Sequence, residues 1–488
     1  MIHYISNETL NLERLEVIIS EGVKLKLSEE AVVNIEKSYT YLQNRLKNAT
    51  NPIENVVSAS CFDSNGKILP QKISENQHNL LKSYACGFGS TAPDTIVKLM
   101  LFLKIQSLSY GYSGVHLKTV ERLIDFFNND ILPVVYLEGA PDDRISLANM
   151  ALPLIGEGEV RINGKVFSAC ELEAQYGWRS LQLGAKEGEA LLVGTQLTTA
   201  YAVYCLIKSL KICVLSDFIA SLSADVFGAD ASPFLAEVQA VRPHKGQILT
   251  AKNLRTFLSN NEKKEQYVPE AFYAIPQVHG AVKDAIAAVR KVIRTEINSA
   301  TDNTLIFQEL NAIFYGGNSH TLPLSFALDY LAIALTGLGN ISERRTFHLI
   351  NKTEHLPNKK TLDFWVLQRM GEGISVENKH LAVPTSAENP MLIEKRFDIK
   401  GMGGSAAVKC YQLVENIQQL LAIELLTAML FLENQFDEND VKRVILQDFR
   451  NDLKINKKSF SLKKSLEKTI RFLENFDFSH QIFQNSKI

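Results

Sequence analysis

The stretch "GTQLTTAYAVYCLIKSLKICVLSDFIASLSADVFGA", residues 194–229, decides the fold class of this 488-residue chain. Its apolar side chains fall on every side of a helix, a pattern typical of a helix buried all round in a globular protein. Residues 321–350 and 405–433 have the same character, and residues 95–133 carry apolar side chains at helical spacing. Several long, mostly buried helices predict a mainly α fold built on a helical bundle.

One short segment has strand character instead. Residues 160–162 and 165–167 flank Asn163-Gly164, which is the strongest short signal for a β-hairpin. Loops rich in Gly and Pro separate the helices, and a binding site is expected in such loops. We expect three consecutive domains: an N-terminal helical domain with active-site loops (1–195), a central long-helix bundle (196–436) and C-terminal surface helices (437–488).

The bulk properties of the chain exclude several classes of protein. The net charge of −2 gives no electrostatic reason to expect nucleic acid or a membrane surface as a partner. The N-terminus lacks the apolar stretch of a secretory signal, and no uninterrupted apolar run reaches the roughly 18 residues of a membrane span. We therefore expect a cytoplasmic protein. The six cysteines are scattered without a CxxC pair, which predicts buried free thiols and no metal site.

Eight segments of the chain share a resemblance to one family. They are "SLSYGYSGV" (107–115), "NMALPLIGEGEV" (149–160), "GEALLVGTQ" (188–196), "PQVHGA" (276–281), "EINSATDNTL" (296–305), "YGGNSHTLP" (315–323), "SERR" (342–345) and "LLAIELLTA" (420–428). In this order they resemble the aromatic amino acid ammonia-lyases, which act on histidine, phenylalanine or tyrosine. The resemblance covers nearly the whole chain. It implies an ammonia-lyase/fumarase-like long central bundle with a small N-terminal loop-rich region, and a homotetramer with active sites at subunit interfaces.

The resemblance also implies a prosthetic group that this chain is not equipped to make. Family members cyclise an internal Ala-Ser-Gly into methylidene-imidazolone, an electrophile that captures the substrate so that ammonia can leave. Here the three positions correspond to Ala140, Pro141 and Asp142. Proline has no β-hydroxyl to eliminate, and Asp142 replaces the glycine whose amide nitrogen closes the ring. We therefore expect neither this electrophile nor another cofactor.

Other positions of the family site differ as well. The base tyrosine corresponds to Val56, an asparagine to Val193, a second tyrosine to Glu270, the carboxylate-binding arginine to Tyr273, and a phenylalanine to Ser319. Without the arginine, a substrate carboxylate loses a charge-assisted contact of about 1.5–3 kcal/mol. Ordinary amino acid deamination is therefore disfavoured in both chemistry and recognition.

The residues left at these positions define a candidate site for a small-molecule ligand. The candidate catalytic residues are Glu270, Tyr273 and His320, and the candidate substrate-binding residues are Tyr84, Asn318, Ser319 and Glu388. Tyr84 takes the place of the family's ring-selecting histidine, and Glu388 lies near the family's late Gln-Glu pair. The retained segment 342–345 is interpreted as a source of ion pairs between helices.

Three functions are compatible with this sequence. The first is an elimination that needs no electrophile, on a small non-standard substrate such as a betaine, because a quaternary amine already leaves well; the ergothioneine-cleaving lyases are the example. An aromatic cage of Tyr84, Phe88, Tyr273 and Tyr315 would favour that function. The second is dehydration or isomerisation of a substrate that is not an amino acid. The third is a catalytically silent homologue that acts as a binding or partner subunit.

Overall fold

The computed structural model describes residues 1–53, 56–139, 143–258, 265, 267–353, 364–388, 399–431, 441–453, 461–476, 478 and 483. The α-helices are α1 (Leu12–Ser20), α2 (Glu29–Lys47), α3 (Pro70–Tyr84), α4 (Asp94–Ser109), α5 (Leu117–Asn128), α6 (Asp143–Ala151), α7 (Glu171–Tyr176), α8 (Glu187–Leu192), α9 (Gln196–Phe227), α10 (Ala236–Ala240), α11 (Lys245–Phe257), α12 (Glu270–Tyr273), α13 (Ile275–Glu296), α14 (Leu322–Thr353), α15 (Trp365–Leu381), α16 (Gly403–Phe431), α17 (Val441–Leu453) and α18 (Leu462–Glu474). The strands are β1 (Ile2–Ile5), β2 (Lys24–Leu27), β3 (Phe88–Thr91), β4 (Leu132–Pro133), β5 (Tyr136–Glu138), β6 (Glu159–Ile162), β7 (Lys165–Ser168), β8 (Thr304–Phe307) and β9 (Ala312–Tyr315). The mainly α prediction is confirmed.

The chain divides into two compact units, each assembled from three segments. Unit 1 consists of Met1–Tyr204, Lys291–Phe326 and Thr385–Val408. Unit 2 consists of Cys205–Arg290, Ala327–Pro384 and Lys409–Ile488. The three consecutive domains drawn along the sequence stay a prediction.

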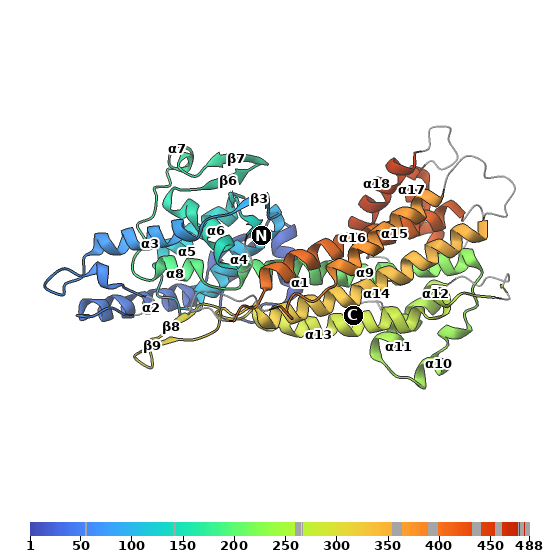
Figure 1. Cartoon of the computed structure of the whole chain (residues 1–488), viewed down its shortest axis with the longest axis horizontal. Coiled ribbons are helices and arrows are strands. Elements are labelled where there is room, and N and C mark those ends of the chain that lie inside the picture. The colour runs from blue at the N-terminus through green and yellow to red at the C-terminus, as the bar shows by residue number, and fades with distance from the viewer. Residues whose placement is uncertain are drawn as a thin grey trace. The chain divides into compact units, whose positions relative to one another are not determined.

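Unit 2 contains the long-helix bundle. In it α9, α13, α14 and α16 lie side by side (Figure 1), and polar contacts join α9 to α13, α9 to α16, and α14 to α16. The side chains of α9 are buried on all sides, including Leu206, Cys213, Ile219 and Leu222. The stretch 194–229 therefore forms the core helix that its apolar pattern predicts.

Unit 1 combines shorter helices with four small sheets. Strand β1 pairs with β2 in parallel, and the other pairs, β3–β5, β4–β6–β7 and β8–β9, are antiparallel. The predicted hairpin is confirmed: β6 and β7 pair across Asn163 (φ 49°) and Gly164 (φ 75°), both left-handed as a tight primed turn requires. The helical segment 95–133 is interrupted at Gly111 (φ 78°), where a Cβ would lie 2.6 Å from the Asn34 carbonyl oxygen.

Two of the long helices have the length and mean hydropathy of a membrane span. They are the stretches Leu322–Lys352 of α14 and Gly403–Phe431 of α16, although neither contains an uninterrupted apolar run of roughly 18 residues. In the most apolar window of α16, 89% of the residues are buried inside the protein. That degree of burial is typical of a core helix, so composition alone is weak evidence for a span.

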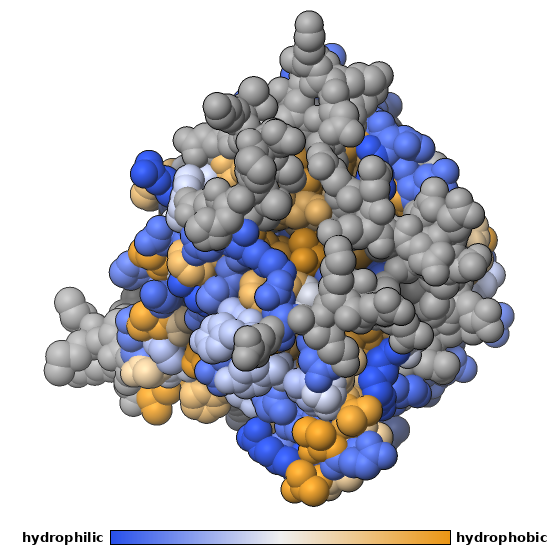
Figure 2. All heavy atoms as spheres, turned by 90° about the vertical axis from the view of Figure 1, so that its right-hand side faces the viewer, coloured by the Kyte–Doolittle hydropathy of each residue, from blue (hydrophilic) through white to orange (hydrophobic). Residues whose placement is uncertain are grey.

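One face of unit 2 carries exposed apolar side chains. Figure 2 shows orange atoms gathered at the lowest part of that face, where Figure 1 places α10 and α11. The exposed apolar residues there include Leu235, Val238 and Val241, the last 86% exposed. Scattered exposed apolar residues are ordinary, and this group is too small to identify a partner.

Candidate functional site

A cavity of about 710 Å³ lies in unit 1, between helix α3 and the loop that precedes it. One part of its wall is apolar and includes Ile53, Val56, Val57 and Leu80. The volume lies in the range of pockets that hold small molecules. Val56 is the residue that corresponds to the family's base tyrosine, so the cavity adjoins one of the positions singled out in the sequence.

Polar side chains of α3 hold the walls of the cavity together. Asn76 donates from Nδ2 to Ser58 Oγ at 3.0 Å and to Ser60 Oγ at 2.8 Å, which fastens the preceding loop to the helix. Gln77 accepts at Oε1 from the Gly188 amide at 2.9 Å, which fastens the first turn of α8. Both α3 side chains line the cavity, so their hydrogen bonds fix its shape as well as its polarity.

Glu189 supplies the carboxyl group of the cavity. It lies in the first turn of α8, and no lysine, arginine or histidine is found among the described residues that line the cavity. Burial raises the pKa of Glu189 because desolvation disfavours the carboxylate, and the nearby Arg144 guanidinium opposes this rise. Asp302 adds to the rise in the pKa and Lys186 opposes it. Perturbed carboxyl groups of this kind are frequent at functional sites.

Buried charged side chains at both ends of α8 hold this helix in place. Lys186 precedes the helix with φ 69° and pairs with Asp302, with 2.5 Å between Nζ and Oδ2. Lys104 donates from Nζ to the carbonyl oxygens of Ala190 (3.0 Å) and Val193 (2.8 Å) at the end of α8. Burial lowers the pKa of Lys104 to about 8. The cation therefore binds the carbonyl end of the helix, where positive charge is favourable.

The prosthetic-loop positions Ala140, Pro141 and Asp142 lie outside the described residues, but both sides of the loop are described. Before it, Glu138 accepts from the Ser90 amide at 3.0 Å. After it, Asp143 accepts from the amide (3.1 Å) and the hydroxyl (2.5 Å) of Thr198. The carboxylate of Asp143 thus joins the start of α6 to the first turn of α9, which is a structural role.

The other candidate residues divide between the two units. Tyr84 ends α3 half-buried, with its ring centre 6.0 Å from the guanidinium carbon of Arg144. Asn318 and His320 are exposed and Ser319 is partly exposed, and His320 Nδ1 accepts from the Leu322 amide at 3.3 Å. These three residues and the exposed Glu388 belong to unit 1.

Glu270 and Tyr273 belong to unit 2, where they are the exposed first and last residues of the short helix α12. None of the seven candidates lines the described cavity, so their roles stay predictions. Of the cage candidates, Tyr84, Phe88 and Tyr315 belong to unit 1 and Tyr273 to unit 2, and the ring contact described for Tyr84 is with Arg144. The aromatic cage stays a prediction. Sequence reasoning also passed over Glu189, whose signal was a lone carboxyl group in the segment "GEALLVGTQ".

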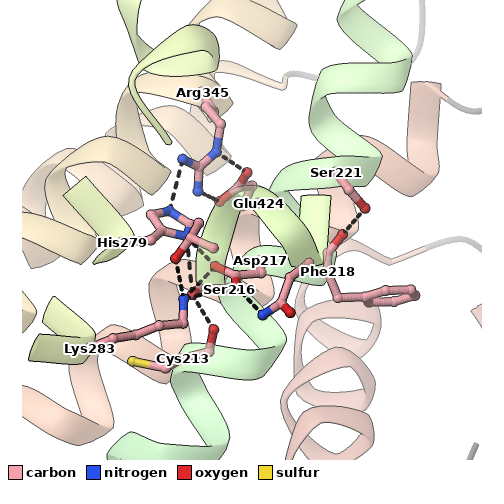
Figure 3. A network of polar contacts seen from close by, with 11 residues as sticks. Cys213, Ser216, Asp217, Phe218, Ser221, His279, Lys283, Arg345 and Glu424 are labelled. Atoms are coloured by element: carbon pink, nitrogen blue, oxygen red, sulfur yellow. Dashed lines mark hydrogen bonds and ion pairs between the residues drawn. The ribbon is translucent and has the colours of Figure 1, made fainter. Parts of the chain in front are cut away.

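The retained segment 342–345 makes the ion pairs that were expected of it (Figure 3). Arg345 donates from Nε and Nη2 to the two carboxylate oxygens of Glu424, at 2.6 and 2.9 Å. Ser342 and Ser223 donate to the same carboxylate, at 2.6 and 2.7 Å. All of these side chains are buried, so a charge in the core of unit 2 is paired and its acceptor sites are filled.

A histidine extends this network towards a second buried carboxylate (Figure 3). Arg345 donates from Nη1 to His279 Nε2 at 3.3 Å, so the histidine proton is assigned to Nδ1, which lies 2.8 Å from Asp217 Oδ1. Lys283 donates to both oxygens of Asp217, at 2.9 and 2.8 Å. Burial lowers the pKa of His279 to about 4, and Arg345 and Lys283 add to this effect, so the imidazole is neutral near pH 7. The network is fully paired and has a structural role.

The histidine, cysteine and acidic side chains of the described residues bear on metal binding and on disulfide formation. Among the described residues, no group of three or more His, Cys, Asp or Glu side chains is arranged to hold a metal ion. All six cysteines are free, as predicted, and Cys61, Cys205, Cys213 and Cys410 are buried; the prediction of burial is wrong for Cys86 and Cys170, which are exposed. Burial raises the pKa of Cys213 to about 12, so the group is a neutral thiol.

Comparison with known proteins identifies the family. The sequence profile described as "Aromatic amino acid lyase" matches residues 10–451. Histidine ammonia-lyase of Deinococcus radiodurans is 35% identical over 449 residues, which cover 88% of this chain and 86% of that protein. The crystal structure of histidine ammonia-lyase from Trypanosoma cruzi superposes with a TM-score of 0.90 at 27% identity, covering 100% of this chain and 95% of the other.

A second structure shows that the same fold is found outside the named ammonia-lyases. The ergothioneine-degrading enzyme of Treponema denticola superposes with a TM-score of 0.84 over 97% of this chain and 99% of the other. At 20% identity, this similarity concerns the fold alone. The matching profile spans most of the sequence and the lyase of Deinococcus radiodurans aligns over most of both proteins. The chain therefore belongs to the aromatic amino acid lyase family.

Proposed function

We propose that this family member is a lyase that catalyses an elimination without methylidene-imidazolone, on a small non-standard substrate. The observation that carries the proposal is the sequence Ala140-Pro141-Asp142 at the positions of the prosthetic triad. Dehydration of a serine side chain supplies the methylidene carbon in the family, and Pro141 has no hydroxyl group to lose. These residues do not fit the prosthetic group, so the proposed elimination proceeds without it.

The substitutions around the loop support a change of substrate. Val193 cannot make the amide hydrogen bonds of the asparagine that it replaces, and Tyr273 cannot form a bidentate pair with a carboxylate. A substrate that carries its own good leaving group, such as a quaternary amine, needs no electrophile. The cavity beside Val56 supports retained ligand handling over a silent homologue, because it is open and has a polar wall.

The proposal includes a homotetramer with sites at the subunit interfaces, in the cytoplasm and without nucleic acid or membrane partners. Glu270, Tyr273 and His320 are the proposed catalytic residues, and all three are exposed in the single chain. Exposed residues of this kind fit a site that is completed by neighbouring subunits. Tyr84, Asn318, Ser319 and Glu388 are the proposed contacts with the substrate.

Two measurements test the proposal. Intact-mass and peptide-mass spectrometry of the purified protein should show residues 138–144 at the unmodified mass, since loss of two waters across residues 140–142 would demonstrate the electrophile and overturn the proposal. The second is a turnover assay with matched pairs of substrates: histidine, phenylalanine and tyrosine, each beside its N,N,N-trimethyl betaine. We expect release of trimethylamine and an unsaturated acid from at least one betaine, without ammonia from the amino acids. Release of ammonia, or no release from any pair, would contradict the proposal, and the latter would favour a silent homologue.

A further inference from the structure

We propose that the cavity beside α3 binds the cationic amino group of its ligand through Glu189. The ligand class is an organic amine cation with an apolar body, bound without a cationic partner for a carboxylate. This inference deepens the proposed function and rests on it in one respect, namely that the cavity still handles a ligand. The binding itself requires no catalysis, and it can therefore be tested separately.

The lining of the cavity carries an acidic group and no basic side chain among the described residues. Glu189 is the carboxyl group among the described lining residues, and those residues include no lysine, arginine or histidine. An ionised Glu189 therefore gives the wall a negative charge with which a ligand cation can pair directly. A ligand carboxylate at the same place would meet a like charge and find no bidentate partner on the wall.

The polar wall of the cavity retains unused hydrogen-bond acceptors. Asn76 uses its amide NH₂ group for Ser58 and Ser60, so its carbonyl oxygen retains acceptor capacity. Ser83, another lining residue, donates its hydroxyl hydrogen to the Leu80 carbonyl oxygen at 2.8 Å, and the hydroxyl oxygen is left as an acceptor. A wall with spare acceptors and one carboxyl group suits a donor such as an ammonium group.

The apolar wall of the cavity can contact the apolar body of the ligand. Ile53, Val56, Val57 and Leu80 line the same cavity as Glu189. A ligand that places its cation at Glu189 can therefore lay an apolar body against these side chains, and burial of that body adds to affinity in proportion to its area. A volume of about 710 Å³ leaves room for a ring as well as an ammonium group.

The charged groups around Glu189 leave its carboxyl available to pair with a ligand cation. Lys186, the lysine that acts electrostatically on Glu189, is already bound to Asp302 at 2.5 Å. Arg144 acts on Glu189 through space, and its guanidinium also faces the Tyr84 ring. The backbone amide of Glu189 lies 3.4 Å from Gln77 Oε1, so the main chain that carries the carboxyl is held in place.

The test uses three probes that share a phenyl ring and differ in charge: 2-phenylethylammonium, 2-phenylethanol and 3-phenylpropionate. Isothermal titration calorimetry of the full-length oligomer at neutral pH should show the cation binding roughly 10-fold or more tightly than the alcohol or the anion. Glu189→Gln has nearly the same shape without the charge, and it should abolish this preference. Glu75→Gln is the matched control, because Glu75 lies on α3, is exposed and pairs with Lys72 away from the cavity lining.

The comparison of the three probes uses the wild-type protein alone. It therefore tests the proposal even if the Glu189→Gln variant folds poorly. Equal affinity for the three probes, preference for 3-phenylpropionate, absence of binding, or a preference that survives in Glu189→Gln would each overturn it. Failure of the turnover assay with retained cation preference would identify a silent amine binder. Turnover without cation preference would overturn this inference and leave the proposed function standing.

Discussion

Arg345 and Glu424 form a bidentate ion pair in the core of unit 2, with nitrogen–oxygen distances of 2.6 and 2.9 Å and both side chains fully buried. Removing one partner leaves an uncompensated charge, so we expect Glu424→Gln to lower the free energy of unfolding by about 3–5 kcal/mol. The double variant Arg345→Met/Glu424→Met should lose less than the sum of the single variants. Urea unfolding followed by circular dichroism measures these differences. Glu75→Gln, in the exposed Lys72–Glu75 pair, is the control and should change stability by less than about 1 kcal/mol; equal effects in the two pairs would contradict the prediction.

His279 should make the protein sensitive to acid. Burial lowers the pKa of His279 from its ordinary value of 6.5 to about 4 in the folded protein, because it disfavours the cation that Arg345 and Lys283 also repel. Between these pH values the unfolded chain binds the proton first, so stability that is present above pH 6.5 is lost as pH falls towards 4. The interval corresponds to a loss of about 3 kcal/mol at most. His279→Gln keeps a donor for Asp217 and an acceptor for Arg345 without titrating. A plot of melting temperature against pH should be flatter for this variant, and parallel curves would refute the assignment.

Two glycines should respond to alanine in opposite directions. A Cβ on Gly280, in α13, would overlap the backbone of Gln247 in α11. Gly280→Ala should therefore cost about 2–3 kcal/mol of stability or more, since backbone cannot move aside cheaply. Gly373 lies exposed in the middle of α15, with no atom within 4 Å of an added Cβ. Gly373→Ala should raise stability by about 0.5–1 kcal/mol, the difference in helix propensity. Chemical unfolding of both variants checks the pair, and a loss in Gly373→Ala would point to contacts that the single chain does not show.

Sequence reasoning succeeded where the signal was local. The helix α9 followed from apolar residues on all sides, and the β6–β7 hairpin followed from Asn163-Gly164, whose left-handed conformation few other pairs adopt at low cost. The interruption between α4 and α5 was not predicted, because apolar spacing continues on both sides and the reason for Gly111 is the remote carbonyl of Asn34. Assembly of unit 1 from three segments leaves no local pattern either; the Ile306 amide, for example, donates to the Tyr112 carbonyl oxygen at 2.8 Å.

The candidate site was predictable to a smaller extent. Family positions could be assigned along the sequence, but whether His320 or Tyr84 lines a cavity depends on packing that the sequence does not encode locally. Glu189 was passed over because a single carboxyl group in an apolar helix usually faces solvent. Its place in the cavity depends on α3, which lies more than a hundred residues earlier in the chain and is held to α8 through Gln77.

The exposed side of α14 should be part of the proposed homotetramer interface. Phe326, Tyr330 and Ile333 lie three and four residues apart, so they share one helix face, and they are 57%, 49% and 48% exposed in the single chain. We expect Ile333→Asp to shift the assembly to smaller species, because an interface core excludes unpaired charge. Light scattering coupled to size-exclusion chromatography measures the mass. Val33→Asp, an equally exposed site on α2, is the matched control and should leave the mass unchanged; an unchanged mass for Ile333→Asp would remove this face from the interface.

Glu189 should lower the stability of the protein at neutral pH, although we propose that it binds the ligand. Its pKa is raised above the ordinary value of 4.5 by burial and by Asp302, while Arg144 and Lys186 act in the opposite direction without cancelling the rise. In the acid range both the folded and the unfolded protein carry a neutral Glu189, and stability is lost as pH rises through the folded pKa, because the folded state resists ionisation. Glu189→Gln cannot ionise. The two melting-temperature curves should therefore converge below pH 4.5 and separate towards neutral pH, with the variant the more stable. A constant offset at every pH would indicate a packing effect, and a less stable variant at pH 7 would show that Arg144 dominates. The expected result, higher stability together with lost cation preference, distinguishes a residue kept for binding from one kept for the fold.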